Sequence, residues 1–261
     1  MSLNQSLISP TASPNLDQAL RLKLKRRADA AGSLGELEPL AVRLGLIQNT
    51  LKPRFRSPQM VFFAGDHGLA VDGVGSPGQP TTVNVTRRLL TSQLPVSVFA
   101  SIQGLELSVV DCGIADALPP HARLLSRKIA HGTRNARIGS AMSLEQAHAA
   151  IRAGMEIADA LPGNVVACAG IGVGANESAA LVMARLSGAP VRELTLAGTY
   201  ETPDALARAL VSMQGALARH RDATDPVEVL AALGGFEMAA MVGLMLVAGS
   251  KRHLIIVDGM A

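Results

Sequence analysis

The segment Gly65-Asp66-His67-Gly68 places an aspartate directly before a histidine. It follows the compact apolar run Gln59–Ala64, which is typical of a buried strand. In open parallel sheets, ligands bind beyond the carboxyl ends of the strands. Asp66 and His67 are therefore candidates for a turn that contacts a ligand, and the alternative is a structural hydrogen bond between the two side chains.

Other polar side chains stand at similar junctions. Asp111 and Asp258 also follow expected strands, where each could contact a ligand or simply cap the following turn. Arg134 lies in a polar junction ahead of a helix expected to begin near Ser143. Its planar guanidinium could bind a phosphate or a carboxylate, or remain solvated in a loop.

Two glycine-rich segments complete the candidate chemistry. Residues 73–80 are rich in Gly and Pro and include Gln79, which indicates a shaped loop at a ligand site or a plain surface turn. Residues 169–178 join an expected strand to an expected helix and include Gly172 and Gly174. Such a junction can present backbone N–H groups to a phosphate, although tight turns use glycine anyway. It lacks the Lys-Ser/Thr ending of a P-loop. The residues alone thus favour an α/β enzyme that binds a small phosphorylated ligand.

The elements that position these residues alternate between strands and helices. Compact apolar runs predict strands at Gln59–Ala64, Glu106–Asp111, Asn164–Ala169, Val191–Leu196 and His253–Val257. Helical patterns between them cover Thr82–Ser92, Val96–Gln103, Ser143–Leu161, Asn176–Leu186, Pro203–His220 and Phe236–Ala248. The alternation predicts a mostly parallel sheet of about five or six strands with helices on both faces.

The N-terminal region differs in character. Residues 1–15 are polar and contain proline, so we expect them to be disordered. Residues 16–50 are predicted to be helical, and Ser33 with Glu36 could form a capping box ahead of an apolar run. Residues 51–261 are predicted to form the α/β domain.

Composition narrows the class of protein. Hydrophobic residues make up 48% of the 261 residues, but aromatic residues only 2%, so the core must be aliphatic. A formal net charge of +3 with so few aromatics argues against a binder of single-stranded nucleic acid, but is compatible with a small anionic ligand. Cys112 and Cys168 lie in apolar stretches, which favours buried thiols over a disulfide or a nucleophile.

No Cys/His cluster in the sequence has metal-ligand spacing, so no metal is expected. The N-terminus does not resemble a secretory signal, and the longest apolar run, Met238–Gly249, is too short to span a bilayer. A cytoplasmic protein without membrane contact is expected.

Taken in order, several segments resemble one family, the nicotinate-nucleotide:dimethylbenzimidazole phosphoribosyltransferases. The matching segments are 32–38, 63–68, 110–114, 132–135 with 141–143, 234–240 and 257–259. The resemblance runs from about Asn15 to Ala261 and implies a Rossmann-like sheet with a small helical domain made from both chain ends. It also implies a homodimer and no metal or redox cofactor.

The resemblance implies a reaction as well. The family transfers phosphoribose from nicotinate mononucleotide to 5,6-dimethylbenzimidazole in cobalamin biosynthesis, releasing nicotinate and giving α-ribazole phosphate. A carboxylate takes a proton from the benzimidazole while its other nitrogen displaces nicotinate at C1 of the ribose. The residues expected to bind the substrates are Asp66, His67, Gln79, Arg134, Gly172 and Gly174.

The chain departs from the family pattern at several positions. A family glutamate falls at Gly170, which makes Glu177, further along the same segment, a candidate substitute. A family lysine expected to bind phosphate falls at Ala209, and of the family's Ser-x-Tyr-Pro-Gln loop only Gln79 is kept. The family glutamate proposed as the catalytic base lies beyond the position of Ala261. The sequence as written therefore predicts slow turnover.

Two alternatives follow from these departures. One is a non-catalytic relative that binds a nucleotide or a base, as a regulator or a partner of a complete enzyme. The other is a phosphoribosyltransferase with a different acceptor, such as a purine, a phenol or another benzimidazole.

Overall fold

A parallel sheet of five strands forms the centre of the protein in the computed structural model, which describes residues 8–74, 79–195 and 200–259. The strands are β1 (Gln59–Gly65), β2 (Glu106–Gly113), β3 (Leu124–Ser126), β4 (Val165–Ile171) and β5 (Leu254–Ile256). Their order is β3-β2-β1-β4-β5, and every neighbouring pair is parallel. The chain thus winds outward in both directions from β1, as in a Rossmann-like sheet. The predicted fold class is confirmed.

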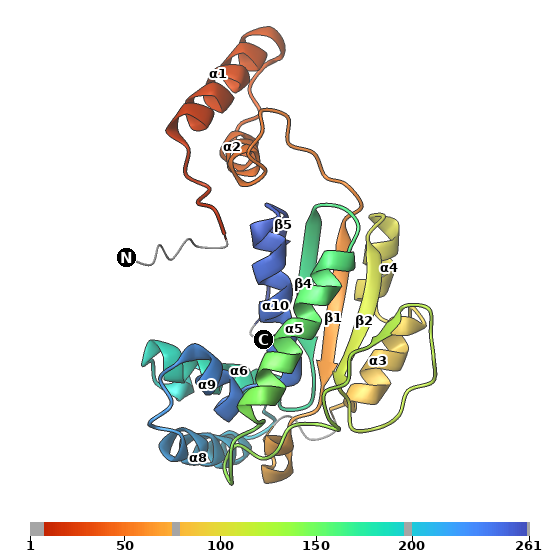
Figure 1. Cartoon of the computed structure of the whole chain (residues 1–261), viewed down its shortest axis with the longest axis vertical. Coiled ribbons are helices and arrows are strands. Elements are labelled where there is room, and N and C mark those ends of the chain that lie inside the picture. The colour runs from red at the N-terminus through yellow and green to blue at the C-terminus, as the bar shows by residue number, and fades with distance from the viewer. Residues whose placement is uncertain (1–7, 75–78, 196–199, 260–261) are drawn as a thin grey trace.

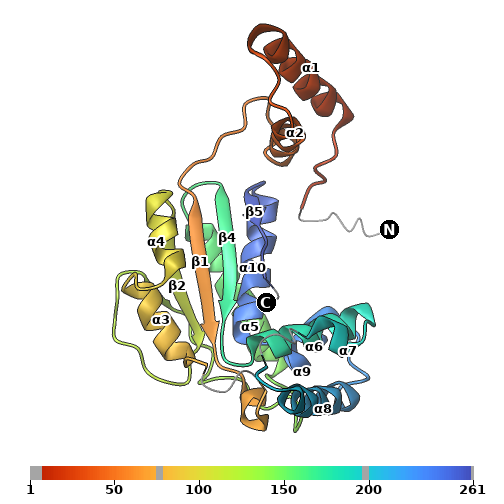
Figure 2. The same ribbon diagram turned by 180° about the vertical axis from the view of Figure 1, so that it is seen from behind.

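Helices cover both faces of this sheet (Figure 1). The helices of the described residues are α1 (Pro14–Ala31), α2 (Leu37–Ile47), α3 (Thr82–Leu90), α4 (Pro95–Ile102), α5 (Leu144–Ala160), α6 (Ala175–Ser187), α7 (Val191–Leu194), α8 (Pro203–Arg219), α9 (Pro226–Leu233) and α10 (Phe236–Ser250), with a 3₁₀ turn η1 (Gly68–Asp72). Helices α3 and α4 pack on one face, and α5 and α10 lie on the other (Figure 2). None of the helices in the described part of the chain is long and apolar enough to cross a membrane.

Alternation along β1 shows how the core is divided between the two faces. Val61 and Phe63 pack with residues of α5 and α10, while Phe62 and Ala64 pack with residues of α3 and α4. Successive side chains of a strand point to opposite faces, so one apolar run serves both layers. The partner residues on the helices are mostly Ala, Leu, Val and Met, which confirms the expected aliphatic core.

A second cluster of helices lies beside the carboxyl ends of the strands. Helices α6, α7, α8 and α9 share a core that includes Leu181, Met213 and Leu233, all fully buried. The helical turn Val191–Leu194 belongs to this cluster, so the strand predicted at Val191–Leu196 is wrong. Val191 and Leu194 stand three residues apart and both face the cluster, which suits a helical turn better than a strand. Leu196 lies outside the described residues.

Strand β3 and helix α9 were not expected from the sequence. Strand β3 has only three residues and pairs with β2 alone, so its apolar pattern is too short to recognise. Helix α9 begins with Asp225 accepting bonds from the N–H groups of Val227 and Glu228, followed by Pro226 in the first turn. That combination is a strong helix-start signal and could have predicted α9.

Helices α1 and α2 form a hairpin beyond the amino ends of the strands (Figures 1 and 2). The capping box predicted between Ser33 and Glu36 is wrong. Ser33 Oγ instead donates to Glu38 Oε1 at 2.6 Å, and the same carboxylate oxygen accepts the N–H of Leu34 at 3.0 Å. Glu38 takes this role because α2 begins at Leu37 rather than earlier. Residues 1–7 of the expected disordered N-terminus lie outside the described residues.

Candidate functional site

The turn that follows β1 places His67 against a buried glutamate. His67 Nε2 lies 2.8 Å from Glu237 Oε1, and the two side chains are 1% and 0% exposed. Glu237 comes from the first turn of α10, far along the chain. An ionised carboxylate only accepts hydrogen bonds, so Nε2 of His67 carries the proton in this pair. The two residues form a fully buried dyad at the carboxyl edge of the sheet.

Glycines surround this dyad because no side chain would fit there. A Cβ at Gly235 would lie 2.3 Å from Glu237 Oε2 and 2.4 Å from His67 Cε1. A Cβ at Gly172 would lie 2.0 Å from the carbonyl oxygen of Gly65, and Gly174 has a φ of +84°, which favours glycine. Gly172 and Gly174 thus both lie against His67.

The charge of His67 depends on Glu237. Burial by itself lowers the pKa of His67, but the negative charge of Glu237 and the hydrogen bond to it act in the opposite direction, and the pKa is raised overall. His67 Nδ1 and Glu237 Oε2 have no hydrogen-bond partner among the described residues. An ionic pair with unsatisfied atoms is a costly arrangement for stability alone, which favours a role in function.

The raised pKa of His67 predicts a pH-dependent stability. The charged imidazole stabilises the fold below its unfolded pKa of about 6.5. That contribution is lost as the pH rises through the higher folded pKa. We expect the free energy of unfolding of the wild type to fall with pH above about 6.5, and the Glu237→Gln variant to show a flatter profile. Urea unfolding at a series of pH values measures both slopes, and equal slopes would contradict the assignment.

Asp66 connects three segments at the carboxyl edge of the sheet through hydrogen bonds. Its Oδ1 accepts the hydroxyl of Thr82 at 2.5 Å, and its Oδ2 accepts the N–H of Ala115 at 2.7 Å. The Thr82 hydroxyl oxygen in turn accepts the N–H of Val173 at 3.1 Å. The expected alternative of an Asp66–His67 hydrogen bond is therefore wrong, because both carboxylate oxygens of Asp66 bind elsewhere. Asp66 links the loops after β1, β2 and β4.

The other two acids that follow strands stabilise their own turns. Asp111 Oδ1 accepts the N–H of Ile114 at 3.0 Å, and its Oδ2 forms an ion pair with Lys128 at 3.0 Å. Asp258 Oδ1 accepts the N–H of Gly259 at 2.9 Å. For both residues the capping alternative describes the observed contacts.

Gln79 is exposed and lies shortly before α3. Thr82, three residues later, bonds to both Asp66 and Val173, so the approach to α3 is at the carboxyl edge too. Residues 75–78 of the glycine-rich loop lie outside the described residues.

The backbone and the side chain of Arg134 lie in different surroundings. The backbone of its loop packs on the β1 turn, since a Cβ at Gly68 would lie 2.5 Å from both the Arg134 carbonyl carbon and the Thr133 oxygen. The guanidinium, however, donates through Nε to the carbonyl of Ser140 at 3.0 Å. It lines a separate hollow of about 290 Å³ with Ser143 at the start of α5. None of Asp66, His67, Gly172 or Gly174 lines that hollow.

Glu177 lies in the first turn of α6 and is 5% exposed. Its Oε1 accepts the hydroxyl of Tyr200 at 2.8 Å. This contact joins α6 to the segment that leads into α8. The sequence did not indicate Tyr200 as a partner.

The cysteines play no part in this geometry. Cys112 and Cys168 are free and buried. Burial raises the pKa of Cys168 to about 11 and that of Cys112 as well. Neither thiol is disposed to act as a nucleophile, which confirms their interpretation as small buried residues.

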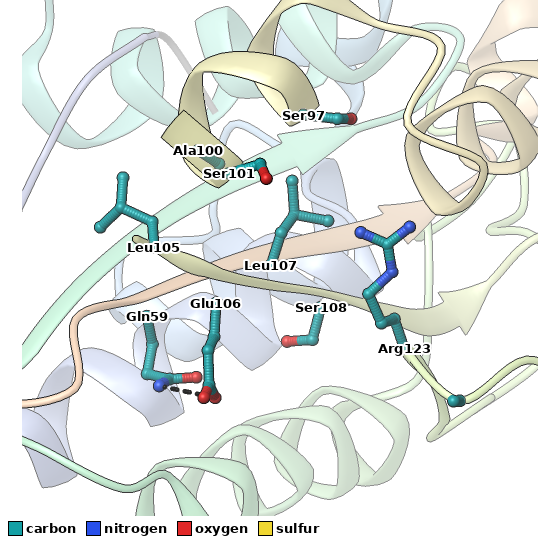
Figure 3. Close-up of a pocket in the computed structure, with 10 residues that line it drawn as sticks. Gln59, Ser97, Ala100, Ser101, Leu105, Glu106, Leu107, Ser108 and Arg123 are labelled. Carbon is teal, nitrogen blue, oxygen red and sulfur yellow. Dashed lines mark hydrogen bonds between the residues drawn. The ribbon is translucent and has the colours of Figure 1, made fainter. Parts of the chain in front are cut away.

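A different hollow, of about 390 Å³, lies between α4 and the beginning of β2 (Figure 3). Gln59 and Glu106, the first residues of β1 and β2, border it and lie side by side, with a 3.1 Å hydrogen bond between side chains that point to the face of the sheet away from α4 (Figure 3). Because strands begin here, the hollow is at the amino edge of the sheet, away from His67.

Sequence reasoning missed Glu237, the residue that completes the dyad. A signal was present, since Glu237 is the one charged residue of the otherwise apolar helix α10. A buried acid in an apolar helix is more informative than an exposed one. The preceding Gly234-Gly235 also indicated a close approach of backbone and side chains.

Comparison with known proteins decides the family. A family model described as "Phosphoribosyltransferase" matches residues 9–261. The chain belongs to this family. A phosphoribosyltransferase of Variovorax paradoxus (strain S110), named nicotinate-nucleotide–dimethylbenzimidazole phosphoribosyltransferase, is 40% identical over 260 residues, covering 98% of this chain and 74% of the relative. A protein of the same name from Cupriavidus taiwanensis is 41% identical over 253 residues, covering 94% and 73%.

A solved structure agrees with this phosphoribosyltransferase assignment. The crystal structure of CobT from Thermus thermophilus is similar with a TM-score of 0.85 and 31% identity, covering 95% of this chain and 75% of that chain. The family resemblance indicated by the sequence segments is therefore confirmed for this phosphoribosyltransferase.

Proposed function

We propose that this chain transfers phosphoribose from nicotinate mononucleotide to 5,6-dimethylbenzimidazole or a closely related base, as a step of cobalamin biosynthesis. The products are α-ribazole phosphate and nicotinate. The observation that carries the proposal is the similarity, over nearly the whole chain, to relatives named for this reaction. The convergence of Asp66, His67, Gly172 and Gly174 at the carboxyl edge supports the location of the site.

The loop after β4 suits the phosphate of the donor. Thr82 already binds the N–H of Val173, and the carbonyl of Gly172 accepts the N–H of Ala175. The N–H groups of Asn176 and Glu177, in the first turn of α6, are then the ones that can bind phosphate oxygens. Fixed amide donors orient the donor so that C1 of its ribose faces the acceptor base. Gln79 is proposed to contact that base, and Arg134 to contribute positive charge.

The dyad is proposed to hold this loop rather than to react. His67 contacts both Gly172 and Gly174, and Glu237 fixes the imidazole by the 2.8 Å bond. A loop placed within a fraction of an ångström is what orientation catalysis needs. His67 and Glu237 are therefore positioning residues.

Proton removal from the acceptor needs a carboxylate, and we propose Glu177. It lies in the first turn of α6, after Gly174, and a hydrogen bond from Tyr200 orients it. Replacement of Glu177 by glutamine should lower kcat by about a hundred- to ten-thousandfold, the usual contribution of a general base. The measurement is α-ribazole phosphate formation followed by mass spectrometry, with nicotinate mononucleotide and dimethylbenzimidazole as substrates.

The matched control is Tyr200→Phe, which removes the hydrogen bond but keeps the carboxylate. It should reduce kcat by less than about tenfold, because the carboxylate of Glu177 remains and loses the hydrogen bond that orients it. Full activity of Glu177→Gln would exclude Glu177 as the base. An absence of the product with the unaltered chain, with a purine or a phenol converted instead, would favour the alternative of a transferase with another acceptor.

Three further features of this enzyme are part of the proposal. We propose a division into a helical segment, residues 16–50, and an α/β domain, residues 51–261. We propose a cytoplasmic homodimer that contacts neither membranes nor nucleic acid and uses no metal or redox cofactor. Sedimentation of the purified chain measures the oligomeric state.

A further inference from the structure

A cleft of about 680 Å³ lies at the amino edge of the sheet, where the segment after α2 meets the ends that lead into β4 and β5. Its walls carry a concentration of basic side chains. The lining residues with cationic side chains are Lys52, Arg54, Arg56, Lys251 and Arg252, with His253 beside them. The parallel strands begin at this edge and run to the opposite one (Figure 1). Strand β1 ends there at Gly65, just ahead of His67, so this cleft is distinct from the proposed active site.

The charge in this cleft exceeds that of the whole chain. Five cationic side chains line it and no acid of the described residues does, whereas the formal net charge of the chain is +3. Within the described ranges only Lys251 has an acidic partner, Asp159 at 2.6 Å, and Arg252 donates to the backbone carbonyls of Ile47 and Pro10. The rest of the chain therefore carries a small net negative charge, so the cleft is more positive than the molecule as a whole.

Three of these cations are unpaired in the part of the chain that the structure describes. The side chains of Lys52, Arg54 and Arg56 are exposed and form no hydrogen bond or ion pair with any of the described residues. Arg137, by contrast, has an acidic partner on the surface, Asp72, at 2.7 Å. Like charges in one cleft repel each other and lower stability unless an anion joins them.

The backbone that carries the unpaired cations is held in place. The Gln48 side-chain amide bonds to both the N–H and the carbonyl of Arg54, at 2.9 and 3.0 Å. The Asn164 amide bonds to the Arg54 carbonyl and the Arg56 N–H, each at 2.9 Å. This segment has no regular secondary structure, yet two amides fix it. A preorganised basic loop loses less entropy when it binds an anion.

We propose that this cleft binds a small anion with several phosphate groups in a row. Arginine forks and a lysine ammonium are the groups that bind phosphate oxygens. One phosphate cannot neutralise three unpaired cations together with Arg252, whereas a triphosphate can. The volume of about 680 Å³ suits a ligand of nucleotide size. Inorganic triphosphate and the triphosphate of a nucleotide share this chemistry.

The test is isothermal titration of the full chain with sodium triphosphate, orthophosphate and ATP at matched ionic strength. We expect triphosphate to bind at least about tenfold more tightly than orthophosphate, since each added charged hydrogen bond contributes about tenfold. The variant Lys52→Gln/Arg54→Gln/Arg56→Gln should lose this preference. Equal affinities for ATP and triphosphate would indicate that the cleft recognises the phosphates alone. A higher affinity for ATP would identify the ligand as a nucleotide.

The matched control changes three exposed arginines outside the cleft, Arg26→Gln/Arg87→Gln/Arg88→Gln, by the same total charge. It should bind triphosphate with nearly wild-type affinity. An equal loss in this control would overturn the proposal, because the binding would then follow net charge alone. Competition by saturating nicotinate mononucleotide would also overturn it, since the anion would then occupy the carboxyl edge. Persistence of binding under saturation supports the separate site.

Discussion

Replacement of His67 by leucine should lower the free energy of unfolding by about 3–5 kcal/mol. The change leaves the Glu237 carboxylate fully buried, with its Oε1 contact removed and its Oε2 already without a partner among the described residues. A charged group in that position loses its hydration without compensation. Urea unfolding followed by far-ultraviolet circular dichroism at neutral pH gives the value.

The double variant His67→Leu/Glu237→Met separates the charge effect from the loss of packing. Because it removes both partners together, it should be more stable than His67→Leu alone. A double variant that is less stable than the single one would show that shape, rather than the unpaired charge, dominates. Both variants should also lose transferase activity, since the Gly172–Gly174 loop is no longer held.

Replacement of Gly154 by alanine should lower the free energy of unfolding by about 1–3 kcal/mol. We expect a value near the upper end of this range, because two packed helices must shift. Gly154 lies on α5, where an added Cβ would come within 1.8 Å of the Ala240 carbonyl oxygen on α10. The obstacle is backbone, so no side-chain rotation relieves it. An added Cβ at Gly243 of α10 would likewise lie 1.9 Å from the Ile151 carbonyl oxygen on α5. The two helices would have to move apart and loosen the core above the sheet.

Gly215→Ala is the matched control for this prediction. Gly215 lies within α8, and an added Cβ would have only ordinary contacts, at 3.5 Å and beyond, with Arg137. Alanine is favoured over glycine inside a helix by about 1 kcal/mol, so this variant should be slightly more stable than the wild type. Thermal unfolding of the pair gives opposite shifts, and a Gly154→Ala variant as stable as Gly215→Ala would refute the close-contact argument.

The sequence predicted the sheet well because its central strands are continuous apolar runs between helical patterns. Strands β1, β2, β4 and β5 lie where they were expected, and local composition is sufficient for such buried strands. The error at Val191–Leu196 has the opposite origin, since a short apolar run of this kind suits a strand or a buried helical turn equally. Only its packing against α6 and α8 decides between the two.

The candidate site was predictable only in part. Asp66, His67, Gly172 and Gly174 all border the carboxyl ends of neighbouring strands, and a general rule for parallel sheets places such residues together. The partner of His67 is 170 residues away in the chain, and no local pattern connects the two. The direction of the Arg134 side chain depends on one hydrogen bond to Ser140, which spacing cannot foresee.

The contact between Tyr200 and Glu177 has a consequence for spectroscopy. The chain has one tyrosine and no tryptophan, and that tyrosine is 9% exposed within the cluster of α6, α8 and α9. Near-ultraviolet absorbance and fluorescence therefore come almost entirely from one phenol, whose hydroxyl donates to a buried carboxylate. These signals report opening of that helical cluster at a single residue, while far-ultraviolet dichroism averages over the whole molecule. Tyr200 thus serves as an intrinsic spectroscopic probe next to the proposed base Glu177, without any added dye.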